Sequence, residues 1–140
     1  MLKTFAPNPK KVETKWHFID ADNKVLGRIA TEISILLMGK NKAIYAPNEV
    51  VGDKVVVINA KKVAVTGNKA HDKVYHHYTG FPGGLRTITF EKLMEKKPTE
   101  ALRKAVKGML PKNKLQKILM SNLYIYEGAE HPHTAQENIK

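Results

Sequence analysis

The chain has 140 residues, with 24 Lys+Arg against 13 Asp+Glu, a formal net charge of +11 and no cysteine. This length suits one domain with its own hydrophobic core, and the missing cysteines exclude disulfides, thiolate nucleophiles and cysteine-based zinc sites. No apolar run approaches the roughly 20 residues of a membrane helix, and the N-terminus lacks a signal-peptide core, so we expect a cytoplasmic protein without a membrane partner.

The excess of positive charge predicts a polyanionic partner. Arginine occurs only at positions 28, 86 and 103, and the other 21 basic residues are lysines. Lysines neutralise phosphates as point charges, whereas arginines are better suited to reading base edges with paired hydrogen bonds. The alternative interpretation is that the lysines only keep the protein soluble. Net charge alone does not distinguish this interpretation from binding to a polyanion. The clustering of the basic residues along the chain favours a polyanionic partner.

The first fifteen residues predict an extended basic arm, because they hold four lysines, including Lys10 and Lys11, and two prolines. A loose terminus without a partner is the alternative. Residues 16–20 predict a strand. Asp22 or Asn23 is expected to cap a helix whose apolar positions between residues 25 and 37 follow the helical period.

Gly39 is expected to end this first helix, and Lys40 and Lys42 follow it. Part of that charge is structural, since cations complement the helix dipole. Residues 54–58 form an apolar run that predicts a strand buried on both faces, as in a parallel sheet. A further strand is expected at residues 73–78.

The second half of the chain predicts a loop at residues 81–84 and a short helix at 90–97. Thr99 is expected to cap a helix that starts at Glu100 and ends before Pro111. A helical turn near residues 115–120 and a strand at 123–126 complete the pattern. Strands alternating with helices predict an α/β domain.

The stretch between Ala101 and Tyr126 is the most informative of the chain, because it contains no acidic residue. It carries six positive charges, on Arg103, Lys104, Lys107, Lys112, Lys114 and Lys117. A basic loop between two apolar elements can hold a phosphate backbone while the fold stays intact.

No catalytic group of residues stands out. Serine occurs only at Ser34 and Ser121, without a Gly-x-Ser-x-Gly elbow. Gly80, Gly83 and Gly84 lack the Gly-Lys-Ser/Thr ending of a P-loop, so a glycine turn near a partner fits them better than a nucleotide cradle.

Histidines and tyrosines gather at residues 75–78. The pair His76-His77 is a poor metal site, since neighbours on a strand point to opposite faces, and neither this pair nor His131 and His133 comes with a metal-binding helix motif. Stacking on bases, or hydrogen bonding to phosphates and 2′-hydroxyls, is one interpretation and favours RNA. A polar strand edge is the other, and the sequence leaves both open.

A series of short motifs runs between residues 16 and 136, among them Asp20-Ala21, Leu26-Gly27-Arg28, Gly52-Asp53, Lys62 to Lys69, Asp72 to Tyr75, Gly83-Gly84, Lys107 to Pro111, and His131 with His133. In order and spacing these motifs resemble the bacterial ribosomal large-subunit protein of the thirteenth family. The resemblance implies a three-layer α/β/α domain with a mainly parallel four-stranded sheet. We place this RNA-binding domain at residues 16–128, the basic arm at 1–15 and a polar C-terminal tail at 129–140.

The resemblance also implies a structural constituent of the large ribosomal subunit, with no catalytic site and no cofactor. Its partners would be large-subunit ribosomal RNA and neighbouring large-subunit proteins, and its role would be subunit assembly and hence translation. No metal ligand is expected. The residues expected to contact RNA are Lys10, Lys11, Arg28, Lys40, Lys42, Thr66, Asn68, Lys69, Lys73, Tyr75, His76, His77, Gly83, Gly84, Arg86, Arg103, Lys107, Lys112, Lys114, Lys117, His131 and His133.

The chain departs from the family pattern just after the Lys107 to Pro111 motif. Gln116 replaces a usual glycine, and Asn113-Lys114 replaces a usual glycine–proline pair, which leaves the backbone path of residues 113–116 open. Two further hypotheses stand beside the ribosomal one. The first is a small nucleotide-binding α/β enzyme, for which no residue can be nominated. The second is a regulator that binds messenger RNA with the same surface.

Overall fold

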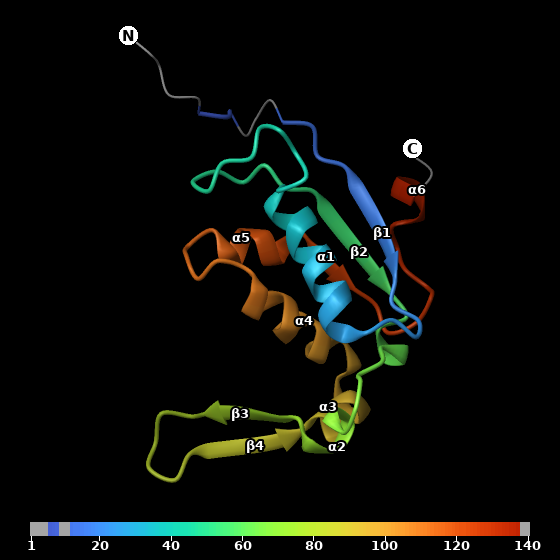
Figure 1. The fold of residues 1–140 in the computed structure, drawn as a ribbon, viewed down its shortest axis with the longest axis vertical. Helices are drawn as coiled ribbons and strands as arrows, with labels where there is room; N and C mark the ends of the chain where they lie inside the picture. Colours follow the sequence, from blue (N-terminus) through green and yellow to red (C-terminus); the bar gives the residue numbers. More distant parts are fainter. Residues whose placement is uncertain (1–5, 9–11, 138–140) are drawn as a thin grey trace.

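A parallel sheet of three strands lies at the centre of the computed structural model, which describes residues 6–8 and 12–137 (Figure 1). Its strands are β1 (Trp16–Asp20), β2 (Lys54–Ile58) and β5 (Leu123–Ile125), in the order β1-β2-β5. The strands expected at 16–20 and 54–58 are confirmed, and the last one ends a residue earlier than expected. The four-stranded parallel sheet is not confirmed, because among the described residues this sheet has three strands.

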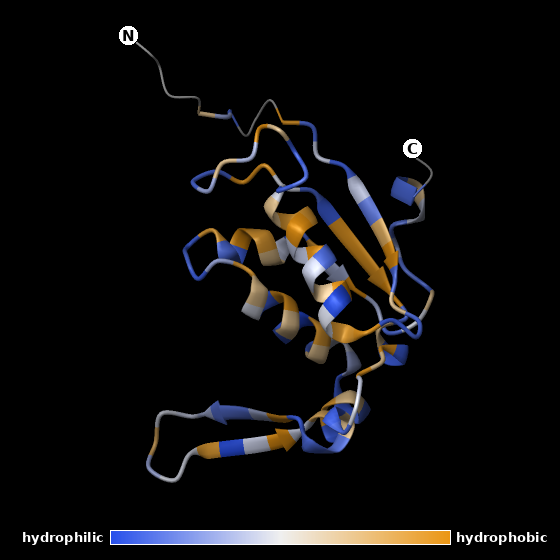
Figure 2. Cartoon of the chain, in the orientation of Figure 1, coloured by the Kyte–Doolittle hydropathy of each residue, from blue (hydrophilic) through white to orange (hydrophobic). Residues whose placement is uncertain are grey.

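Three helices cover one face of this sheet: α1 (Leu26–Met38), α4 (Pro98–Met109) and α5 (Gln116–Ser121). Ile29, Ile33 and Leu37 of α1 are buried in one core cluster with Leu102 and Val106 of α4 and with Val55 and Val57 of β2. Figure 2 shows β2 as hydrophobic along most of its length. Because Val56, on the opposite face, is also fully buried, the apolar run of β2 is a strand covered on both sides, as expected. In the part of the chain that the structure describes, no helix has the length and apolar character to cross a membrane.

The C-terminal residues cover the opposite face of the sheet, and we call residues 126–137 the C-terminal strap. The strap ends in the short helix α6 (Thr134–Glu137), beside β1 in Figure 1. The imidazole of His133 lies 5.1 Å from the ring of Trp16 and 4.7 Å from that of Tyr124, and His131 lies 5.5 Å from Phe18. A hydrogen bond of 2.9 Å joins the Tyr126 hydroxyl to Nε2 of His133. Two of the four histidines predicted to contact RNA, His131 and His133, thus pack against aromatic rings of the sheet.

The C-terminal end of α1 agrees with expectation, whereas the N-terminal ends of α1 and α4 differ from it. Gly39 ends α1 as expected, because it adopts the left-handed conformation with φ of +74° and its N–H donates to the carbonyl of Leu36. Neither Asp22 nor Asn23 caps this helix, which starts at Leu26 after Val25 and has no side-chain cap. Thr99 does not cap the helix expected from Glu100, because this helix already begins at Pro98 and has no side-chain cap. Proline suits the first turn, where its missing N–H costs nothing.

A two-stranded antiparallel hairpin extends away from the helices and the central sheet (Figure 1). It consists of β3 (Val74–Tyr78) and β4 (Leu85–Thr89), and the sequence analysis missed its second strand. The chain reaches the hairpin through the short helices η2 (Ala60–Lys62) and α2 (Lys69–Asp72), and leaves it through α3 (Phe90–Lys96). The strand expected at 73–78 therefore exists, but it pairs with the residues that follow it instead of joining the parallel sheet.

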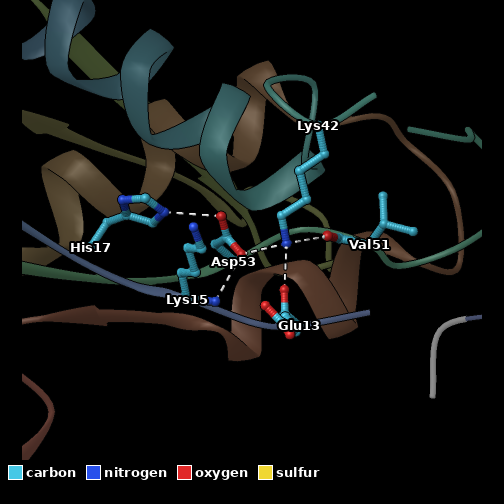
Figure 3. A network of polar contacts seen from close by, with 6 residues as sticks. All are labelled: Glu13, Lys15, His17, Lys42, Val51 and Asp53. Carbon is cyan, nitrogen blue, oxygen red and sulfur yellow. Dashed lines mark hydrogen bonds and ion pairs between the residues drawn. The ribbon is translucent and has the colours of Figure 1, made fainter. Parts of the chain in front are cut away.

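A buried carboxylate ties the start of the fold to the loop after α1 (Figure 3). Asp53 is 1% exposed, and its Oδ1 lies 2.6 Å from Nζ of Lys42 and 3.0 Å from the backbone N of Lys15. Its Oδ2 lies 2.9 Å from Nε2 of His17. The Lys42 ammonium also donates to the backbone carbonyls of Glu13 and Val51. Lys42, predicted to contact RNA, thus has its charge engaged inside the fold.

The hydrogen bonds around Asp53 shift the pKa of its carboxyl group. Burial raises that pKa, but the bonds from Lys42, from the Lys15 N–H and from His17 together outweigh burial, so the pKa lies below its ordinary value of 3.8. The stabilising contribution of this carboxylate is therefore complete above that ordinary value and disappears as the pH falls through the lower folded-state pKa.

Replacing Asp53 with Asn should lower the free energy of unfolding by about 3 kcal/mol at neutral pH, because it leaves the Lys42 ammonium without its counter-charge. Urea unfolding at pH 7 measures this loss. As the pH falls below 3.8 and through the lower folded-state pKa, the difference between wild type and variant should shrink, since Asp53 of the wild type becomes protonated. Asp22→Asn is the matched control, because it removes an exposed pair with Lys62 and should cost less than about 1 kcal/mol. Equal losses in the two variants would contradict this role of Asp53.

Candidate nucleic-acid interface

A basic groove of about 800 Å³ lies between α4 and α5. Its lining holds five cations and one carboxylate, together with three uncharged side chains; these residues are Arg103, Lys104, Lys107, Lys114, Lys117, Glu100, Asn113, Gln116 and Met120. The groove arises from the amphipathic pattern of α4, which buries Ala101, Leu102 and Val106 against the core and turns its charged side outward. Four of the predicted RNA-contacting residues, Arg103, Lys107, Lys114 and Lys117, therefore meet in one hollow.

Asn113 and Gln116 build the turn that closes this groove. The Gln116 side-chain amide donates to the backbone carbonyl of Lys107 over 2.9 Å and to that of Leu110 over 3.3 Å. These are carbonyls at the C-terminal end of α4, which have no partner within the helix itself. The Asn113 side chain in turn accepts the N–H of Gln116 over 3.2 Å. Gln116 and Asn113 thus hold α5 against the end of α4, a role that the sequence analysis did not foresee.

Tyr75 connects the groove to the hairpin. The Lys104 Nζ of α4 lies 5.1 Å from the centre of the Tyr75 ring, and the Lys73 Nζ lies 5.5 Å from it, distances typical of cation–π contacts. Burial raises the pKa of the Tyr75 hydroxyl, and this hydroxyl has no hydrogen-bond partner among the residues that the structure describes. Lys104 was counted in the basic run but not among the predicted contact residues, although it lines the groove and faces Tyr75.

A second, smaller hollow of about 260 Å³ lies on the other side of α4, where this helix meets the start of α1. Thr66, Lys69 and Lys73 line it together with apolar side chains from Val25, Leu26, Val65, Ala105 and Met109. Three predicted contact residues therefore come together here. Because Lys73 lines this hollow and Lys104 lines the groove, the ring of Tyr75 lies between the two basic sites.

The other predicted residues are spread over the surface or lie elsewhere. Exposed side chains belong to Arg28 on α1, Lys40 after it, Asn68 before α2, Lys112 in the α4–α5 loop, His76 and His77 on β3, and Arg86 on β4. Gly83 and Gly84 lie in the hairpin loop. Lys10 and Lys11 fall outside the described residues. Lys42, His131 and His133 make the internal contacts given above, so we leave them out of the interface.

The comparisons with known proteins agree with the resemblance. The family model described as ribosomal protein L13 matches residues 14–132. The large ribosomal subunit protein uL13 of Geobacter sulfurreducens is 56% identical over 137 residues, which cover 98% of this chain and 96% of that relative. The proteins of the same name from Vibrio parahaemolyticus and from Legionella pneumophila strain Corby are 53% and 52% identical, and each comparison covers 97% of this chain and at least 94% of the relative.

These matches extend over the central sheet, the hairpin and both basic hollows. The relatives are ribosomal proteins and not enzymes, which decides against the nucleotide-using enzyme weighed from the sequence. The chain belongs to the ribosomal protein L13 family.

Proposed function

We propose that this chain is a structural constituent of the large ribosomal subunit that binds ribosomal RNA through the α4–α5 groove, in cytoplasmic ribosomes. The observation that carries the proposal is the charge of the groove, five cations against one carboxylate within about 800 Å³. Such a hollow concentrates positive potential, and the partner that it suits best is a backbone with regularly spaced phosphates.

The chemistry of the groove favours positioning over reading a sequence. Four of its five cations are lysines and one is Arg103, so the contacts act mainly as point charges on phosphates. In an assembling subunit, RNA segments that converge repel each other through their phosphates. A rigid basic groove between them would lower that repulsion, which is how we expect the chain to support assembly beside neighbouring large-subunit proteins.

The removal of four lysines of the groove and its loop tests the proposal. The variant with Lys107, Lys112, Lys114 and Lys117 all changed to Ala should bind purified large-subunit ribosomal RNA more weakly. The slope of log affinity against log salt should become shallower by about 3, because each lost phosphate contact removes roughly 0.7–0.9 from it. Filter binding between 50 and 300 mM KCl measures the slope, and thermal unfolding checks that the variant keeps its fold, since all four side chains are exposed.

The matched control removes the same charge elsewhere. Lys24, Lys61, Lys96 and Lys97 are exposed and outside both hollows, and their joint replacement by Ala should leave the slope within about one unit of wild type. Equal changes in the two variants would mean that net charge, and not the groove, determines binding. A flat salt response of the wild type would contradict the whole proposal.

Messenger RNA would meet the same lysines, so the regulatory hypothesis is compatible with this proposal. A competition experiment separates the two roles. A defined messenger hairpin that displaces ribosomal RNA at equal concentration would support a regulator, whereas displacement only by a large excess would leave ribosomal RNA as the preferred partner.

A further inference from the structure

The outer end of the β3–β4 hairpin exposes large apolar side chains. Phe81 in the loop is 74% exposed, and Tyr78 and Leu85, which face each other in the strand register, are 59% and 62% exposed. These are the three highest exposures of large hydrophobic residues among those described. Figure 2 shows hydrophobic residues at this far end, where the hairpin projects beyond the helices. An exposed aromatic group held away from the core costs solubility, and this placement indicates a contact.

The loop that carries Phe81 is closed by hydrogen bonds. The N–H of Gly84 donates to the carbonyl of Phe81 over 2.9 Å, and the N–H of Thr79 donates to the carbonyl of Gly84 over 3.1 Å. A glycine suits this point, because a Cβ atom at Gly84 would lie only 2.8 Å from the backbone carbonyl oxygen of Phe81 and would also meet the Thr79 hydroxyl. The loop therefore presents Phe81 from a defined backbone, and less entropy is lost when this side chain is covered.

The charge of the hairpin indicates which partner covers this end. From Lys73 to Phe90 the chain has no acidic residue. Arg86 pairs with His77 in the strand register. This pair lies next to the Tyr78–Leu85 pair, on the side away from the hairpin loop. At the base of the hairpin, Tyr75 meets Lys104 of the groove lining. The apolar end thus belongs to a hairpin that carries positive charge without acidic residues and meets the groove at its base, which fits a partner that is anionic and presents flat apolar faces.

We propose that Phe81, supported by Tyr78, stacks on unpaired nucleobases of the RNA that the α4–α5 groove holds by its phosphates. This inference rests on the proposed function and adds a second kind of contact to it. Every base has a face on which an aromatic ring can stack, so such a contact needs no particular sequence. Unpaired bases in loops and bulges are the parts of RNA whose faces are free. The hairpin would therefore add a contact that salt does not screen.

The test compares Phe81→Ala with Phe81→Trp on protein-free large-subunit ribosomal RNA. Phe81→Ala should weaken binding about 5- to 150-fold, the range expected for one lost base–aromatic stack, and it should do so equally at every salt concentration. The salt slope should stay at the wild-type value, since no phosphate contact is removed. Ile35→Ala, which removes an exposed apolar side chain of α1, is the control and should bind as wild type does.

Phe81→Trp should restore the affinity, and its added indole fluorescence should be quenched by RNA beyond the change seen for wild type, whose single tryptophan is Trp16. Unchanged affinity of Phe81→Ala, with steep salt dependence of the wild type, would overturn the stacking and leave the groove proposal standing. If the RNA affinity of Phe81→Ala is unchanged and subunits that carry this variant also lack a neighbouring protein, the hairpin end contacts a protein instead of RNA. Failure of the wild type to bind at all would instead overturn the proposed function.

Discussion

The central strand β2 is the constraint on which the rest of the fold depends. Val55, Val56 and Val57 are fully buried, and because neighbouring side chains on a strand point to opposite faces, both faces of the sheet must be covered. Burial of each valine contributes about 1.5–3 kcal/mol. Helices α1 and α4 cover the face of Val55 and Val57, while Phe18 and Tyr124, the register partners of Val56, meet the C-terminal strap on the other.

This covering determines where positive charge can gather. α4 turns one side to the core, so Arg103, Lys104 and Lys107 must lie on the opposite side, where α5 completes the groove. Gln116 fixes that geometry through the end of α4. Charges that lie close to the core are instead neutralised, as Lys42 is by Asp53. The fold thus separates structural cations, which have partners, from those that are free to meet a polyanion.

Sequence patterns predicted what depends on local periodicity and composition. The apolar run at residues 54–58, the period of the first helix and the acid-free stretch after Ala101 indicated a buried strand, a covering helix and a basic surface, and all three are found. Patterns could not show which cations the fold neutralises, because the site of Lys42 is assembled by tertiary contacts of Asp53 with Lys15 and His17, which are far from it in sequence. The roles of His131 and His133 likewise depend on tertiary packing against Trp16 and Phe18. Residues 85–89 alternate too weakly in hydropathy to indicate β4 without its partner strand.

We propose that the groove between α4 and α5 holds this chain in the large ribosomal subunit. Sedimentation on sucrose gradients after a wash in high salt, with tagged wild type and the variant without Lys107, Lys112, Lys114 and Lys117, tests this directly. We expect wild type to stay with large subunits through the wash, while the variant moves largely to the light fractions. Wild type in the light fractions, or a variant held as firmly as wild type, would contradict it.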